Sequence, residues 1–337
     1  MQVLKLCRSA LPLVAAIVLA LGVLAAPVTA QDAAGSDPTA ETLTEQQLFE
    51  ELNKIQGRVT IPNPQAATLE QPQGRDFRAF HEGTLPWIGG IVILGMLVAI
   101  AVFYFVRGRI RTKGPKANVR ILRFNAIERL AHWLTATAFI VLAITGLNFI
   151  FGKRLLMPLI GADAFGSWSQ WAKYTHDFFA WGFMLGVLVI LVVWVWDNLP
   201  DRYDANWLKH GGGMFDKSNS THPPAGRFNA GQKLIFWSVV LGGAALSVSG
   251  IFMLFPFAFT DVNGMQLAQT IHAIVGVLMI AVIIAHIYIG SLGMEGAFDA
   301  MESGTVDLNW AKQHHSAWVE KKGDAGAPPR RATTPAE

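Results

Sequence analysis

The chain has 337 residues, of which 52% are hydrophobic and only 15% are charged. This composition, with a positive mean hydropathy of +0.36, excludes a single soluble domain and is typical of a protein with several membrane spans. The formal net charge is +3, and the basic residues cluster beside apolar segments, so their pattern indicates membrane topology and argues against nucleic-acid binding.

The N-terminal segment has the layout of a secretory signal peptide. Lys5 and Arg8 precede an apolar run over residues 11–26, and small residues follow up to Ala30. We expect a signal peptide over residues 1–30 that is cleaved after Ala30. The alternative is an uncleaved membrane anchor, because the apolar run is long for a signal peptide.

Residues 31–84 are rich in Gln, Ala, Pro and acidic residues and show little apolar periodicity. We predict an exported N-terminal extension that is largely loop, with one short helix near residues 41–55.

Five apolar runs follow, each long enough to cross about 30 Å of hydrocarbon. They cover approximately residues 85–106, 131–151, 174–196, 234–255 and 268–292. We therefore predict an all-α integral membrane protein. In it, residues 85–107 form an additional N-terminal transmembrane helix, residues 108–292 a four-helix domain and residues 293–337 a C-terminal tail.

The distribution of Lys and Arg predicts the orientation of these spans. With an exported N-terminus, the cytoplasmic segments carry 18 Lys and Arg residues and the outer segments carry 7. This asymmetry agrees with the positive-inside rule. We expect a multi-pass protein of the bacterial inner membrane, with its N-terminus in the periplasm after signal cleavage and its C-terminus in the cytoplasm.

A short sequence recurs where two of the spans begin. It reads Arg123-Phe124-Asn125-Ala126, with Leu130 and Trp133, and again Arg227-Phe228-Asn229-Ala230, with Leu234 and Trp237. The recurrence suggests two similar helical hairpins packed into a four-helix core. The alternative is that basic and aromatic residues recur independently at membrane surfaces.

Four of the nine histidines lie in or at the edges of spans, where ionisable groups are rare and usually functional. His272 and His286 share the last span, and their separation of 14 residues places them within about 40° of one helix face and about 21 Å apart along the axis. His132 begins the second span on the cytoplasmic side, and His176 begins the third on the outer side. Depth therefore pairs His132 with His286 and His176 with His272.

Two imidazoles from facing helices can bind haem iron from both sides, which leaves no open position and suits electron transfer. The only cysteine, Cys7, lies near the N-terminus, so the spans offer no thiolate as a metal ligand. We predict two b-type haems, with the inner haem iron bound by His132 and His286 and the outer haem iron by His176 and His272. The alternative for a histidine in a span is a buried hydrogen-bonding or proton-relay group.

Other residues near these histidines suggest how a haem would be accommodated. Small residues near the ligands are expected to leave room for the porphyrin, namely Gly182, Gly186 and Gly276. Arg129 and Lys173 at the span ends are candidates for contacts with propionates, although basic residues at these places commonly act as topology anchors.

Seven stretches of this sequence, in order over about residues 119–319, resemble the gamma, or cytochrome b, subunit of membrane-bound formate dehydrogenase. They are Arg129-Leu130-Ala131-His132-Trp133, His176-Asp177-Phe178-Phe179, Asn198-Leu199-Pro200-Asp201, Asn229-Ala230-Gly231-Gln232-Lys233, Ile271-His272-Ala273, His286-Ile287-Tyr288 and Trp310-Ala311-Lys312-Gln313-His314-His315. The resemblance implies a four-helix diheme cytochrome b bundle. The signal-like start, the exported extension and the first span depart from the compact pattern of that family.

The resemblance also implies partners and a quinone site. The subunit would take electrons from an iron–sulfur beta subunit and from a catalytic alpha subunit that holds molybdenum or tungsten and itself oxidises formate. It would pass them through the two haems to a quinone, menaquinone or ubiquinone, in the membrane. The positions that match the quinone site of that family are Asn229, Gly231 and Gln232, together with His286. An ordinary helix N-cap is the alternative explanation for Asn229.

Two other functions stay open from the sequence. Cytochrome b subunits of hydrogenases and related quinone-linked oxidoreductases use similar helices. A proton-coupled transporter whose histidines relay protons would bind no haem, but it would favour broken helices around a midplane site.

Overall fold

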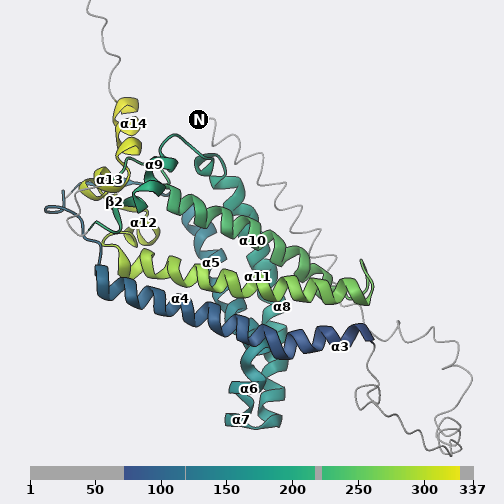
Figure 1. Ribbon diagram of the computed structural model, residues 1–337. Coiled ribbons are helices and arrows are strands. Elements are labelled where there is room, and N and C mark those ends of the chain that lie inside the picture. Colours follow the sequence, from purple (N-terminus) through teal and green to yellow (C-terminus); the bar gives the residue numbers. More distant parts are fainter. Residues whose placement is uncertain (1–71, 118, 217–221, 327–337) are drawn as a thin grey trace, which may run out of the picture. The chain divides into compact units, whose positions relative to one another are not determined.

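The computed structural model describes residues 72–117, 119–216 and 222–326 (Figure 1). The predicted signal peptide, the first part of the predicted extension and its expected helix near residues 41–55 lie outside the described residues. Five helices are long and apolar enough to cross a membrane. The prediction of a mainly helical protein with five membrane spans is therefore confirmed.

Four of the five long helices begin earlier than the apolar runs that predicted them. Their bounds are α4 (Leu85–Arg107), α5 (Ala126–Leu147), α8 (Ala162–Trp194), α10 (Ala230–Leu254) and α11 (Val262–Tyr288). The difference is largest at α8, because hydropathy marks only the apolar part of a helix while its backbone hydrogen bonds continue into polar sequence.

Residues 72–84, which we expected to belong to a loop, are helical. α3 (Pro72–Arg78) and the π-helical segment η1 (Ala79–Thr84) lead directly into α4. No apolar periodicity marks this segment in the sequence, and its helical structure is continuous with the membrane helix that follows.

Small residues bring the helices of the bundle close together. A Cβ atom at Gly186 of α8 would lie 3.1 Å from the Cα of Thr135 in α5, and one at Gly243 of α10 would lie 2.9 Å from Cγ2 of Val187 in α8. α11 packs against α10 on one side and against α4 on another (Figure 1). The result is a bundle of α5, α8, α10 and α11, with α4 added along α11.

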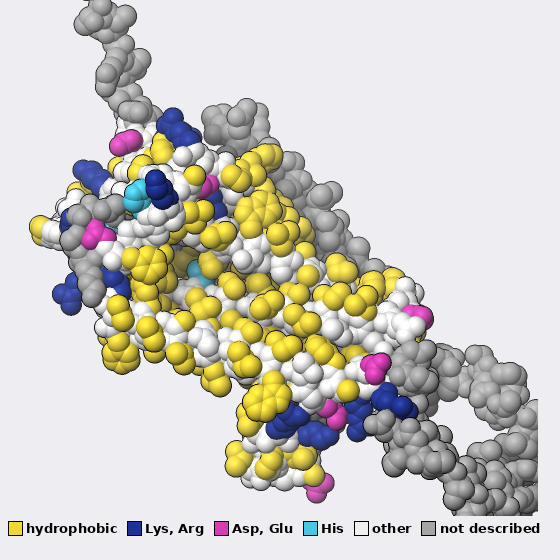
Figure 2. Space-filling model, in the orientation of Figure 1, with side chains coloured by type: hydrophobic (Ala, Val, Ile, Leu, Met, Phe, Trp, Pro, Cys, Tyr) yellow, Lys and Arg dark blue, Asp and Glu magenta, His cyan; other side chains and the backbone are white. Residues whose placement is uncertain are grey.

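The sides of the bundle are covered with hydrophobic side chains, and Lys and Arg gather toward its ends (Figure 2). Phe105 on α4, for example, is 84% exposed. A surface of this kind is suited to lipid. At one end the chain continues through η2 (Asn148–Gly152), α6 (Lys153–Leu155) and α7 (Met157–Ile160), which project beyond the other helices (Figure 1).

The opposite end carries a folded layer, which we call the cap and which comprises the described parts of residues 108–125, 195–229 and 294–326. Its short elements are β1 (Arg120–Leu122), η3 (Trp196–Asn198), α9 (Asp204–Lys209), η4 (Gly211–Gly213), α12 (Asp299–Glu302), β2 (Thr305–Asp307), α13 (Leu308–His314) and α14 (Ser316–Gly326). β1 and β2 pair antiparallel, with Ile121 opposite Val306. Most of the predicted C-terminal tail is therefore folded against the bundle. Two membrane helices continue without a break into π-helical segments, α5 into η2 and then α6, and α11 into η5 (Ile289–Gly293).

The two copies of the repeated sequence face each other in the cap. Nη2 of Arg123 donates to the carbonyl of Arg227 at 2.8 Å, and Nη2 of Arg227 donates to the carbonyl of Arg123 at 2.9 Å. The rings of Phe124 and Phe228 lie 5.6 Å apart. Reciprocal contacts are expected when two similar units meet about a local two-fold axis. They favour the interpretation that the recurrence is a structural repeat.

The helix that follows each copy of the repeat begins with the same kind of N-terminal cap. Asn125 and Asn229 are N-caps whose side chains accept backbone N–H groups, and a capping box is completed by Glu128 in α5 and by Gln232 in α10. The Glu128 carboxylate also forms an ion pair with Arg227 at 2.5 Å and accepts the Trp194 indole N–H at 2.9 Å. One buried carboxylate thus ties together α5, α8 and the start of α10.

We expect Glu128→Gln to destabilise the protein by about 3 kcal/mol, because it breaks an ion pair whose carboxylate is buried. The change keeps the size of the side chain and one acceptor oxygen, but its NH2 group cannot accept the hydrogen bonds that the other carboxylate oxygen receives. The loss therefore reports the charge together with those bonds. Thermal unfolding of the purified protein measures the effect. Glu320→Gln, at an exposed position of α14, is the matched control, and equal melting temperatures for the two variants would contradict the role assigned to Glu128.

Candidate functional site

The four membrane histidines form two pairs, one near the cap and one toward the other end of the bundle. The cap-side pair consists of His132 on α5 and His286 on α11, whose ring centroids are 6.2 Å apart with the planes at 60°. The far-side pair consists of His176 on α8 and His272 on α11, at 6.2 Å and 59°. The structure thus brings together the side chains that depth along the helices had paired.

The spacing within each pair fits a metal ion between the rings. Two imidazole–metal bonds of roughly 2 Å, together with the distance from each nitrogen to its own ring centre, span about the observed 6.2 Å. The partners in each pair make no hydrogen bond to each other among the described residues. Two nitrogen ligands on opposite sides suit the axial positions of haem iron.

The histidines of the far-side pair are held by hydroxyl groups. Nδ1 of His176 lies 2.8 Å from Oγ1 of Thr145 on α5. Nδ1 of His272 lies 3.0 Å from Oγ of Ser249 on α10. Metal-binding histidines usually make such a bond with the nitrogen that does not bind the metal. This arrangement leaves Nε2 of each ring as the candidate metal ligand.

The cap-side pair has no equivalent. Nδ1 of His132 is buried without a hydrogen-bond partner among the described residues, and no described side chain forms a hydrogen bond with His286. A buried ring nitrogen without a hydrogen bond is unfavourable in an apolar interior. Unlike the far-side pair, the cap-side pair has no hydrogen bond from a described side chain that orients its rings.

Of the three glycines expected to accommodate the porphyrin, Gly186 lies at a close helix contact, whereas Gly182 and Gly276 have only ordinary contacts, at 3.9 Å from the position of an added Cβ atom. Gly186 allows the close approach of α5 and α8 described above, whereas Gly146 and Gly250, which the sequence analysis missed, lie beside the ligands. A Cβ atom at Gly146 would be 3.6 Å from Cε1 of His176, and one at Gly250 would be 3.4 Å from Cε1 of His272. Each glycine directly follows the hydroxyl residue that holds the same histidine, a pattern that could have revealed it.

The basic residues suggested for propionates are engaged elsewhere. Arg129 donates to the carbonyls of Met301 and Glu302 in the cap, at 3.2 and 2.5 Å. Lys173 forms an ion pair with Asp177 at 2.6 Å. These contacts support a structural role for both residues.

The three residues matched to a quinone site lie together at the start of α10. Oδ1 of Asn229 accepts the backbone N–H of Gln232, and Oε1 of Gln232 accepts the backbone N–H of Asn229, at 2.9 and 3.0 Å. A Cβ atom at Gly231 would lie 2.7 Å from Trp207, so glycine is needed for this packing. The capping box uses the two side-chain oxygens, and the amide NH2 groups of both side chains make no hydrogen bond to a described residue.

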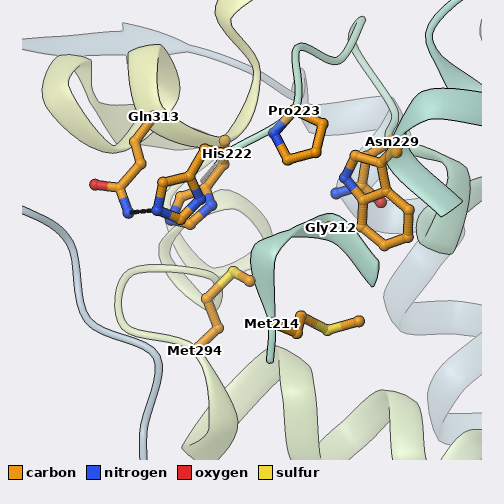
Figure 3. Close-up of a pocket in the computed structure, with 9 residues that line it drawn as sticks. Gly212, Met214, His222, Pro223, Asn229, Met294 and Gln313 are labelled. Atoms are coloured by element: carbon orange, nitrogen blue, oxygen red, sulfur yellow. Dashed lines mark hydrogen bonds between the residues drawn. The ribbon is translucent and has the colours of Figure 1, made fainter. Parts of the chain in front are cut away.

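A small pocket borders this region in the cap (Figure 3). Asn229 lies on one side and His222 and Gln313 on the other, with Met214 and Met294 between them (Figure 3). The amide of Gln313 lies 2.8 Å from Nε2 of His222. The cavity volume of about 20 Å³ is enough for a water molecule and too small for a quinone ring.

Beside this pocket, the cap buries a cationic and imidazole cluster that the sequence analysis did not single out as functional. Arg123 is 3% exposed, and its guanidinium lies over the rings of Phe124, Trp310 and Trp318 at 5.2 to 5.6 Å. Burial, and then repulsion from Arg227, lowers the pKa of Arg123 to about 9.

Two histidines of the cap are also buried as neutral rings. Burial, and then the nearby His222 and Arg123 side chains, lowers the pKa of His314 to about 3. Burial lowers the pKa of His315 well below its usual value, and Nδ1 of that ring lies 2.8 Å from the carbonyl of Gly226. The Gln-His-His stretch therefore packs α13 against the other segments of the cap.

Comparison with known proteins agrees with this geometry. A family model described as prokaryotic cytochrome b561 matches residues 123–304, which include all four membrane histidines. The cytochrome b556(fdo) subunit of formate dehydrogenase from Escherichia coli is 33% identical over 210 residues, covering 61% of this chain and 95% of that protein.

Two further relatives carry similar names. The cytochrome b556(Fdn) subunit of nitrate-inducible formate dehydrogenase from Escherichia coli is 29% identical over 204 residues, covering 60% of this chain and 91% of that protein. The formate dehydrogenase cytochrome b556 subunit of Haemophilus influenzae is 27% identical over 211 residues, covering 61% of this chain and 84% of that protein.

The neutral state of His314 predicts sensitivity of the cap to acid. Unfolding exposes the imidazole, which then binds a proton below about pH 6.5, so stability should fall between about pH 6.5 and the folded pKa of about 3. The slope is on the order of 1 kcal/mol per pH unit. Melting temperatures at pH 7.5 and 5 should therefore differ less for His314→Gln than for the unmodified protein. The exposed His210→Gln variant should keep the full difference, and the same reduction in both variants would contradict the interpretation.

Proposed function

The chain belongs to the prokaryotic cytochrome b561 family, and from this premise we propose that it is the membrane-anchoring cytochrome b subunit of a formate dehydrogenase, with two haem b groups and a quinone as electron acceptor. The family implies haem b, and the relatives are named as formate dehydrogenase cytochrome subunits. The observation that carries the proposal is the pair of facing imidazoles at each of two depths, with the same spacing of 6.2 Å.

We propose that His132 and His286 bind one iron and that His176 and His272 bind the other. Bound haem supplies a reversible one-electron carrier. The four histidines would hold the two haems, leave no iron position open to other ligands and keep the two sites in separate halves of the bundle. Helix α11 contributes one ligand to each site and so sets the distance between them.

The proposed direction follows from the distribution of basic residues. With 18 Lys and Arg residues in the segments assigned to the cytoplasm and 7 in the others, the cap lies on the cytoplasmic side. His176 and His272 then form the outer site in the inner membrane of a bacterium, closest to an exported iron–sulfur beta subunit and a molybdenum- or tungsten-containing alpha subunit. The alpha subunit would oxidise formate, and this chain would carry the electrons inward.

The proposed quinone site is at the start of α10. The capping box orients the side-chain amides of Asn229 and Gln232 and leaves their NH2 groups available to donate to a quinone oxygen. Gly231 lies between these residues. Because the nearby pocket is water-sized, we place the quinone ring on the membrane face of this turn and not within the pocket.

The rest of the chain has a proposed division. We assign residues 1–30 to a cleaved signal peptide, 31–84 to the exported extension, 85–107 to the additional helix, 108–292 to the diheme domain and 293–337 to the cytoplasmic tail. Residues 72–84 of the extension are helical, as described above.

Replacing His272 by Ala should remove one haem and block quinone reduction by the complex, while the catalytic subunit still oxidises formate with a soluble dye. The optical spectrum of the dithionite-reduced protein measures the haem content. His210→Ala, an exposed histidine of the cap, should keep both haems. Unchanged haem content in His272→Ala would contradict the assignment, and a wild-type protein without a Soret band would favour a proton-relay function.

Replacing Asn229 by Asp tests the quinone site separately from the helix cap. Aspartate caps a helix as well as asparagine does but donates no hydrogen bond, so the fold and both haems should be kept. Loss of one hydrogen bond to the quinone should slow oxidation of the reduced haems by quinone about tenfold. Asn125→Asp, at the equivalent N-cap of α5, is the matched control. Equal rates of haem oxidation in the two variants would contradict a quinone site at this turn.

A further inference from the structure

We propose that Thr145 and Ser249 are positioning residues that lower the reduction potential of the far-side haem below that of the cap-side haem. Each copy of the repeat places one hydroxyl group beside a histidine of the far-side pair, and no described hydroxyl group contacts a histidine of the cap-side pair in this way. The inference rests on the proposed function, because it requires that the two histidine pairs bind haem.

The two hydroxyl residues occupy equivalent places in the repeat. Thr145 lies 20 residues after the N-cap Asn125, and Ser249 lies 20 residues after the N-cap Asn229. Equal spacing from equivalent caps puts both hydroxyls on the same face and at the same depth of their helices. Each then meets a histidine of the next long helix, His176 in one hairpin and His272 in the other.

Each hydroxyl has an acceptor on its own helix, and iron at Nε2 would set the direction of its bond to histidine by leaving the ring proton on Nδ1. Oγ1 of Thr145 donates to the carbonyl of Val141 at 2.8 Å, and Oγ of Ser249 donates to the carbonyl of Ala245 at 2.6 Å. A hydroxyl has one proton to donate, so each oxygen accepts from histidine Nδ1–H. With Nε2 bound to iron, the ring proton would be held on Nδ1 by the hydroxyl oxygen.

The cap-side site lacks both the symmetry and the hydroxyls. When the first helices of the two hairpins are aligned at their N-caps, Asn125 and Asn229, the position that corresponds to His132 is Phe236. When the second helices are aligned at His176 and His272, the position that corresponds to His286 is Ile190. Both are buried in the apolar core. The cap-side ligands therefore occur once, and within the described residues neither receives a side-chain hydrogen bond.

This difference has a predictable effect on the iron. An oxygen that accepts the Nδ1–H bond makes the imidazole a stronger base at Nε2, which favours the ferric state and lowers the potential. Two such bonds act at the far-side site and none from a described side chain acts at the cap-side site. The electron step from the far side to the cap side is then downhill, in the direction that the proposed function requires.

The test is a redox titration of the purified protein in its complex, with Thr145→Val and Ser249→Ala. Each variant removes one hydroxyl and keeps nearly the same shape. We expect the potential of the far-side haem to rise in each, with a change in its ferric-to-ferrous ratio of up to about tenfold, equivalent to about 59 mV. Thr145→Ser and Ser249→Thr should restore the original value.

Matched controls use hydroxyls that bond only to their own helix. Thr135 donates to Ala131 at 2.8 Å and Ser247 to Gly243 at 2.7 Å. Thr135→Val and Ser247→Ala should leave both potentials unchanged. The haem that persists in a His132→Ala variant identifies the far-side component in the titration.

The outcomes separate this inference from the proposed function. A protein that binds no haem overturns both. Two bound haems whose potentials do not respond to Thr145→Val and Ser249→Ala, or a shift confined to the cap-side haem, overturns the inference alone. Loss of only the far-side haem in Thr145→Val, with recovery in Thr145→Ser, supports the positioning role.

Discussion

Two imidazole rings must face each other across a gap at two levels of this bundle, and the positions of the long helices follow from that constraint. The rings are 6.2 Å apart in both pairs. α11 supplies one histidine to each, so a rotation or shift of this helix would disturb both sites together. Its packing against α10 and α4 therefore matters as much as the ligands themselves, and the additional helix α4 supports the one element that both sites share.

The repeat explains how the four-helix core is assembled, and its departures from symmetry show where the two halves differ. Arg123 and Arg227 bind each other's backbone, but among the described residues only Arg227 has carboxylate partners, namely Glu128 and Asp197. Glu128 of α5 corresponds to Gln232 of α10. Within the described residues, Arg123 is held by three aromatic rings and by neutral oxygens. Arg123 lies beside the turn at which we propose the quinone site, and Nη2 of Arg123 lies 3.4 Å from Oε1 of Gln232 in that turn.

The spans and the pairing of the histidines could be predicted from the sequence because apolar length and helical periodicity are local properties. The cap could not, since β1 and β2 have three residues each and join segments that are far apart in the chain. The hydroxyl partners were missed for another reason, because Ser and Thr in membrane helices commonly bond to their own backbone. Thr145 and Ser249 do this as well, and only the tertiary structure shows their second bond. Arg129 and Lys173 show how local chemistry leaves a role open, since the structure gives both residues partners within the protein that the sequence did not indicate.

The spacing of 20 residues between each N-cap and its hydroxyl has a consequence for the lipid around the protein. At 1.5 Å per residue the helix rises about 30 Å over this interval, which is close to the thickness of the hydrocarbon layer. The interval between the N-cap and the hydroxyl residue is therefore about as long as the hydrocarbon layer is thick. Since each histidine pair joins two different helices, a single helix cannot tilt to suit a thinner or thicker bilayer without changing the gap between the rings. We therefore expect the bilayer near the protein to adjust its thickness to the bundle.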